Sequence, residues 1–161
     1  MKFSILLIFL LPFYLFSQEE HDHEDHEGGH HFHHKNEIGI ANAPVYFVKE
    51  KSISYGLHLH YVRTLGESKF GLGLGFERIF DDHGHNTIGI VTAYRPIDQW
   101  CINLSPGVSI EDNSPDVLFA LHVETSYEFE INNFHIGPVL EFAYDPEDIH
   151  ISLGLHIGLG F

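Results

Sequence analysis

Apolar residues recur at every second position along most of the chain from Asn36 to the end. This alternation predicts strands that each have one apolar face. None of the alternating runs shows sustained helical spacing, and each is close to the ~9–11 residues that a tilted membrane strand needs. The pattern predicts an all-β fold, an eight-stranded antiparallel up-and-down transmembrane β-barrel, with strands near 36–49, 53–64, 69–80, 86–96, 99–111, 116–130, 133–144 and 149–161.

The two faces of these strands differ in bulk. In the last run the even positions carry only His, Ser and Gly, which cannot fill the core of a soluble barrel. The bulky face is therefore expected to point outward, into lipid, and a β-sandwich with one solvated face is the alternative. The odd positions of this run are apolar throughout, namely Ile149, Ile151, Leu153, Leu155, Ile157, Leu159 and Phe161.

The connections between the runs are of two kinds. Short turns near residues 66–68, 96–98 and 132–133 alternate with longer, more charged loops near 49–51, 81–85, 111–115 and 145–148. Outer-membrane barrels have this asymmetry, and they carry aromatic girdles at both interfaces. The outward aromatics near strand ends are Tyr55, Tyr61, Phe70, Phe80, Tyr94, Trp100, Tyr127, Phe129, Phe134 and Tyr144.

The N-terminus has the composition of a secretory signal peptide. Lys2 precedes an apolar stretch over residues 5–16, which is too short for a membrane-spanning helix. We expect cleavage after residue 17, so the signal peptide is residues 1–17. Only one cysteine, Cys101, is present, which excludes a disulfide framework.

The span 36–161 resembles the small eight-stranded outer-membrane barrels of the OmpA/OmpX type. Its ending, LHIGLGF with Phe161 last, resembles the C-terminal signal that the barrel-assembly machinery recognises. The resemblance implies contact with that machinery and with outer-membrane lipid, and an even strand number puts both termini in the periplasm. The family includes adhesins, structural proteins and lipid-modifying enzymes. The outward face has Thr92 and Thr125 but no serine beside a histidine, so no enzyme activity is predicted.

Residues 18–35 form a polar tail of seven histidines and six carboxylates, with Phe32 as the only large apolar residue. The tail cannot bury enough apolar surface to fold, so we expect it to be disordered. The formal charge of −15 argues against nucleic-acid binding and favours cations. Imidazole and carboxylate are ligands of zinc, nickel, cobalt and copper. The predicted tail ligands are His21, His23, His26, His30, His31, His33 and His34.

Six strand histidines share the inward parity: His58, His60, His122, His135, His150 and His156. Inward carboxylates are expected at Glu77, Glu111, Glu124, Glu128 and Glu141, with Arg95 as an inward base near the periplasmic end. Depth along the strands predicts a second metal site in the lumen, because a barrel of eight strands lets opposing side chains meet. We expect at least one such site, with ligands drawn from His58, His60, His122, Glu124 and His156. A hydrogen-bonded polar plug without metal is the alternative.

The leading functional hypothesis is an outer-membrane barrel that binds divalent transition metal ions and helps to move or buffer them. The rival hypothesis is a structural or adhesive barrel whose histidines only pack the interior. Eight strands leave no open channel in most barrels, so transport is the weaker half of the first hypothesis.

A peptide covering residues 18–35 should bind several equivalents of zinc, nickel or copper near neutral pH. Affinity should fall sharply below about pH 6, because protonated imidazole is no longer a ligand. Calorimetric titration at several pH values measures both effects. Binding that is unchanged at about pH 5 would show that carboxylates are the ligands instead.

Overall fold

The computed structural model describes residues 34–112 and 114–161. The predicted signal peptide and the tail histidines before His34 lie outside the described residues. In the described part, no helix is long and apolar enough to cross a bilayer. The strands are β1 Asn36–Phe47, β2 Ser52–Thr64, β3 Phe70–Phe80, β4 His85–Ile97, β5 Trp100–Glu111, β6 Val117–Tyr127, β7 Phe129–Ile131, β8 Phe134–Tyr144 and β9 Ile149–Gly160.

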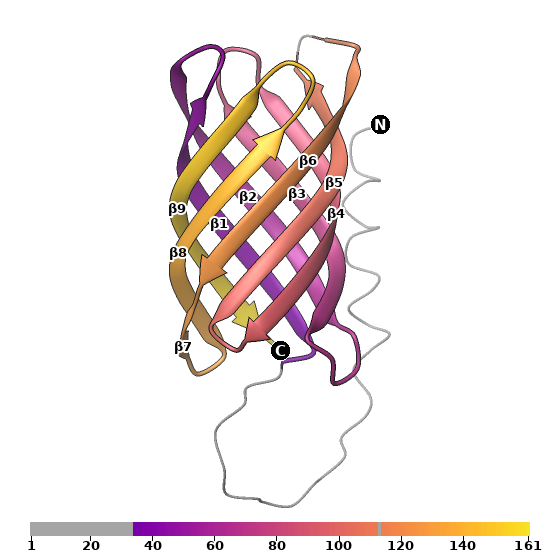
Figure 1. The fold of residues 1–161 in the computed structure, drawn as a ribbon, viewed down its shortest axis with the longest axis vertical. Helices are drawn as coiled ribbons and strands as arrows, with labels where there is room; N and C mark the ends of the chain where they lie inside the picture. The colour runs from indigo at the N-terminus through magenta and orange to yellow at the C-terminus, as the bar shows by residue number, and fades with distance from the viewer. Residues whose placement is uncertain (1–33, 113) are drawn as a thin grey trace, which may run out of the picture. The chain divides into compact units, whose positions relative to one another are not determined.

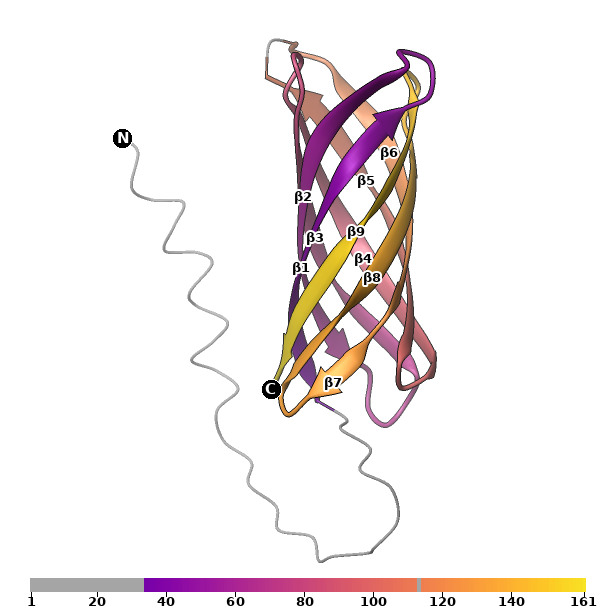
Figure 2. The same cartoon turned by 90° about the vertical axis from the view of Figure 1, so that its left-hand side faces the viewer.

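All strand pairings are antiparallel and the sheet closes on itself. Each strand from β1 to β5 pairs with the next one, and β8 pairs with both β7 and β9. Two further pairings, of β1 with β9 and of β6 with β8, complete the circle. The tilted strands enclose a barrel, with the C-terminus and the short turns at one end (Figures 1 and 2). The prediction of a closed antiparallel barrel is confirmed.

β6 and β7 form one strand of the barrel wall, interrupted at Glu128. Both pair with β8 in the same register, as the partners Ser126–Val139 and Phe129–Ile136 show. By this register Tyr127 faces Pro138, which has no N–H to donate to the neighbouring strand. The ladder is broken there, and the barrel has eight strands in its wall, as the alternation predicts.

The bulky side chains point away from the lumen. In β9, Leu153 is 64% exposed, whereas the adjacent Ser152 is 7% exposed. All ten aromatics of the expected girdles are exposed as well. A surface this apolar is stable in lipid and costly in water, so the alternation places the membrane-facing side correctly.

The interior is filled by imidazole rings that lie against glycines. A Cβ atom on Gly39 would lie 2.3 Å from His60 Nε2 and 2.4 Å from His156 Nε2, and one on Gly158 would lie 1.9 Å from His135 Nε2. These glycines therefore provide the space that the rings occupy. Two small apolar clusters complete the packing, one of Val62, Val91, Ala93 and Cys101 and one of Val45, Phe47 and Ile79.

Leu153→Arg should lower the free energy of unfolding by about 2–4 kcal/mol, the cost of a charge on the lipid face near the bilayer midplane. Urea unfolding of protein folded in lipid vesicles measures this loss. Leu65→Arg is the matched control, because Leu65 is 51% exposed but lies in the turn between β2 and β3. Equal losses for the two variants would contradict the assigned position of the membrane.

Candidate metal centre in the barrel lumen

The inward strand histidines and four of the five expected carboxylates are buried in the lumen. Their exposed fractions are all 7% or less, and they belong to strands on all sides of the barrel. The exception is Glu111, which is partly exposed at the rim. The buried side chains are His58, His60, His122, His135, His150, His156, Glu77, Glu124, Glu128 and Glu141.

Four of these side chains form a tetrad across the lumen: Glu77 of β3, His122 of β6, Glu141 of β8 and His150 of β9. The Nδ1 atom of His122 lies 3.5 Å from Glu77 Oε2 and 3.3 Å from Glu141 Oε1. The Nε2 atom of His150 lies 3.7 Å and 3.9 Å from the same two oxygens. Among the described residues, neither ring nitrogen of His150 has a hydrogen-bond partner.

A second cluster, His58, His60 and Glu124, adjoins the tetrad. The Nδ1 atom of His58 lies 3.0 Å from Glu124 Oε2 and 3.4 Å from Glu141 Oε2, so His58 contacts a carboxylate of each group. Asn103 donates a hydrogen bond of 3.0 Å to Glu124 Oε1. This amide fixes the orientation of the Glu124 carboxylate.

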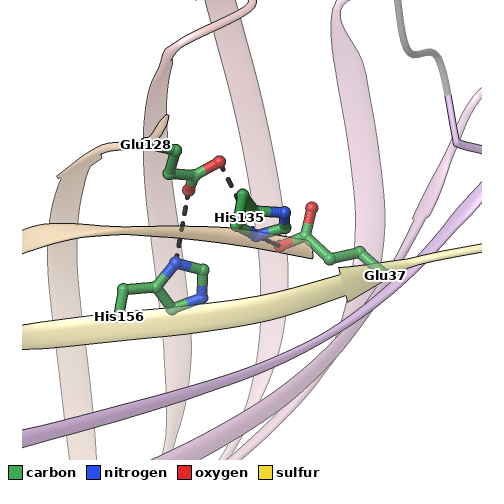
Figure 3. A group of neighbouring side chains, drawn as sticks. All are labelled: Glu37, Glu128, His135 and His156. Carbon is green, nitrogen blue, oxygen red and sulfur yellow. Dashed lines mark ion pairs between the residues drawn. The ribbon is translucent and has the colours of Figure 1, made fainter. Parts of the chain in front are cut away.

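A third cluster lies nearest the chain termini, and Figure 3 shows its members pointing toward one another. It consists of Glu37 of β1, Glu128 between β6 and β7, His135 of β8 and His156 of β9. Glu128 lies 3.7 Å from His135 Nε2 and 3.4 Å from His156 Nδ1, and Glu37 lies 3.5 Å from His135 Nε2. We call this group the mouth cluster.

Arg95 offsets part of the negative charge of the mouth cluster. Its Nη1 donates to Glu128 Oε2 at 2.6 Å, and its Nη2 donates to Glu37 Oε2. Arg95 is the only lysine or arginine that the described structure pairs with a lumen carboxylate. The carboxylates of Glu77 and Glu141 contact imidazoles instead, and that of Glu124 contacts an imidazole and the Asn103 amide. This agrees with the small number of inward lysines and arginines in the sequence.

A fourth group, His85, Glu111 and Glu147, lies at the opposite rim. His85 Nε2 is 3.2 Å from Glu111 Oε1, and its Nδ1 is 2.6 Å from Asp81 Oδ2. The Glu111 carboxyl beside it raises the pKa of Glu147. Two acids close together disfavour joint ionisation, which is the electrostatic condition for attracting a cation.

The five lumen residues predicted to supply metal ligands fall into three clusters. His58, His60 and Glu124 lie together, but His122 belongs to the tetrad and His156 to the mouth cluster. The register separates His122 from His156, because His122 pairs with Ala143 of β8 and His156 pairs with Gly137 of the same strand. Strand parity does not predict this stagger. Five other residues of these clusters are predicted to face inward but are not among the predicted ligands: Glu77, Glu128, Glu141, His135 and His150. Glu37 is predicted neither as a ligand nor as an inward carboxylate.

Of the predicted tail ligands, only His34 falls within the described residues. Its carbonyl oxygen accepts a hydrogen bond of 3.3 Å from the Thr64 hydroxyl. The other six, His21, His23, His26, His30, His31 and His33, lie outside the described residues, so their role as ligands stays a prediction.

The lumen is packed. The cavity beside the tetrad measures about 10 Å³ and is bordered by His58, Glu77, Glu124 and Glu141. This is close to the smallest volume that holds one water molecule. A single ion or water fits between the clusters, and the cavity is far smaller than a continuous channel would be.

The comparisons with known proteins identify the fold. No family model matches the chain, and no curated protein matches it either. Among solved structures, Neisserial surface protein A is 12% identical with a TM-score of 0.59, covering 78% of this chain and 96% of its own. Ail, the attachment invasion locus protein of Yersinia pestis, is also 12% identical with a TM-score of 0.58, covering 80% and 99%.

A third similar structure is the N-terminal β-barrel domain of Pseudomonas aeruginosa OprF, with 16% identity, a TM-score of 0.51, and coverage of 80% of this chain and 98% of that one. A de novo designed transmembrane β-barrel matches with a TM-score of 0.56 at 8% identity, covering 78% and 96%. At these identities the likeness shows the fold alone. The chain is thus a small eight-stranded β-barrel of the transmembrane type, and the resemblance to the OmpA/OmpX type is confirmed at the level of architecture.

Arg95→Met should lower the free energy of unfolding by about 1–3 kcal/mol, because Glu37 and Glu128 would lose their shared charge partner in a mostly enclosed site. Urea unfolding at neutral pH measures the loss. Arg78→Met is the matched control, because Arg78 also pairs with a carboxylate, that of Asp112, but at an exposed rim. A loss for Arg78→Met as large as that for Arg95→Met would contradict the structural role assigned to the mouth.

Proposed function

We propose that this chain is an outer-membrane barrel protein that binds a divalent transition metal ion in its lumen, at Glu77, His122, Glu141 and His150. One observation carries this proposal, the spacing of the donor atoms. The four nitrogen–oxygen distances within the tetrad are 3.3–3.9 Å. A tetrahedral zinc ion with bonds of ~2.0–2.1 Å has ligand–ligand edges of about 3.3–3.4 Å. The four nitrogen–oxygen edges would need to contract by about half an ångström or less, and all four donor atoms lie within 4.8 Å of one another.

The charge of the tetrad supports the same conclusion. Two carboxylates and two neutral imidazoles match a dication, and in the described structure no lysine or arginine pairs with Glu77 or Glu141. The ring nitrogens of His150 and the Oε2 atom of Glu77 lack hydrogen-bond partners among the described residues. A bound ion would satisfy these atoms. Imidazole donors favour zinc, nickel, cobalt or copper over magnesium or calcium.

Similarity to bacterial surface barrels supports an outer-membrane location, with lipid and the barrel-assembly machinery as partners. The tail would lie in the periplasm, since it leads into β1 at the end where the short turns lie. Its seven histidines would hold ions near the mouth of the barrel. The packed lumen favours a role in holding or buffering ions over conduction across the membrane.

A structural or adhesive barrel is the second candidate, and the comparisons favour it. One similar structure is named for attachment and invasion, and another is a surface protein. Each lumen carboxylate also lies beside at least one histidine, so protonated imidazoles would neutralise the acids without a metal ion. The two candidates differ in whether the lumen takes up a metal ion at neutral pH.

Full-length protein refolded in detergent should bind cobalt(II) and show the intense visible absorption of a tetrahedral site. The amount of cobalt bound should exceed the amount bound by the tail by one equivalent per chain. Glu77→Gln/His150→Gln removes two donors with little change in shape and should abolish this absorption. The control is Glu67→Gln/His83→Gln, which changes an exposed acid and an exposed histidine of the turns. Identical spectra and stoichiometry for wild type and the lumen variant would refute the proposal and leave the structural barrel.

A further inference from the structure

The six lumen histidines form an unbroken series along the barrel. From the mouth cluster inward, the ring centroids of His135 and His156 are 5.2 Å apart, and those of His156 and His60 are also 5.2 Å apart. The next steps are 5.5 Å from His60 to His58, 6.4 Å from His58 to His122, and 5.7 Å from His122 to His150. Since a metal–imidazole bond is ~2.0–2.1 Å long, small movements would let an ion contact two successive rings.

Carboxylates link the clusters as well. His58 contacts both Glu124 and Glu141, as described above, and His60 Nε2 lies 3.4 Å from Glu37 of the mouth cluster. Every step of the series therefore has an anionic oxygen within reach. An ion that moves along the rings would not cross a region without ligands.

Several ring nitrogens in this series have no hydrogen-bond partner among the described residues. They are His60 Nδ1, His135 Nε2 and both nitrogens of His156, and the three residues are 7% exposed or less. A buried polar atom without a partner is destabilising. Transient ligation of an ion would supply the missing partner.

The series ends at its outer side against apolar side chains. The Phe47 ring lies 5.4 Å from the ring of His150 and 5.6 Å from that of His85, so it separates the tetrad from the rim group. Val45 and Ile79 pack with Phe47, and all three are at most 2% exposed. None of these side chains offers a ligand atom. On the facing wall, beside Glu77, the buried polar side chains are the hydroxyls of Thr87 and Ser109. Hydroxyls bind zinc, cobalt or copper less well than imidazole or carboxylate, so a step toward the outer rim is unfavourable for an ion in the tetrad.

The opposite end of the series, the mouth cluster, is more exposed and should attract metal ions less strongly. The side chains of Arg95 and Glu37 are 28% and 15% exposed. Arg95 offsets one of the two negative charges of Glu37 and Glu128, whereas no lysine or arginine of the described structure pairs with the tetrad. Attraction for a dication should accordingly increase from the mouth toward the tetrad.

We infer that metal ions enter and leave the tetrad only from the mouth cluster, along His135, His156, His60, His58 and His122, and that Phe47 closes the route to the outer rim. This inference rests on the proposed function and adds the path of exchange. The protein would then exchange ions with the side where its tail lies and would not pass them through the membrane.

The test is the rate at which bound cobalt leaves full-length protein in detergent when excess EDTA is added, followed by decay of the tetrahedral absorption. His60→Phe keeps an aromatic ring but removes the lone pairs in the middle of the series, and His60 is not a tetrad ligand. Release should slow by at least about tenfold, since the ion loses a ligand on its path, while the absorption at equilibrium stays unchanged. His156→Phe is a second variant with the same expectation, in case His60→Phe fails to fold.

The matched control is His85→Phe, the same change beyond Phe47, which should leave the rate unaltered. Unchanged release from both His60→Phe and His156→Phe, or slower release from His85→Phe, would overturn the inferred path. Loss of the absorption at equilibrium in His60→Phe would also overturn it, because His60 would then belong to the site itself. Absence of the absorption in wild type would instead refute the proposed function.

Discussion

The narrow interior of an eight-stranded barrel is the constraint on which the rest of this structure depends. Strand number fixes the width of the lumen, so inward side chains from opposite strands meet. Here that width brings Glu77 and Glu141 to within 3.5 Å of one imidazole nitrogen of His122. Two like charges ~4 Å apart repel by about 4 kcal/mol at an effective dielectric constant of 20. The tetrad therefore needs compensation for this repulsion, which a protonated histidine, a metal ion or a proton on one carboxyl would supply.

This constraint also explains how the packing is divided between the two faces. The large apolar side chains, which form the core of a soluble protein, lie on the outer face of this barrel, where lipid covers them. Inside, glycines such as Gly39 and Gly158 leave space that imidazole rings fill. The outer face needs only to be apolar, whereas the lumen requires a particular fit. Structures that share this fold at 8–16% identity are consistent with that difference, since an alternating pattern can be kept while the lumen residues change.

The alternation of apolar residues predicts the architecture because the side-chain period of a strand is two, so the period decides which residues share a face. The bulk of each face then decides which one points to lipid. The inward orientation of His58, His122 and Glu141 follows directly from it. The grouping of these residues does not, because it depends on the stagger between strands that the hydrogen-bond register sets. His122 and His156 are both predicted ligands, but they lie in different clusters. Glu37 was missed as an inward carboxylate, since it stands at the very start of β1.

Pro138 has a consequence for the mechanics of the barrel wall. It interrupts the ladder between β8 and the strand formed by β6 and β7, beside Glu128 of the mouth cluster. A wall with a missing hydrogen bond resists bending less at that place than elsewhere. The seam lies where a hydrated ion would need extra width to lose its water and contact Glu128. The same proline that divides a strand in two thus makes the wall locally more compliant beside the mouth cluster.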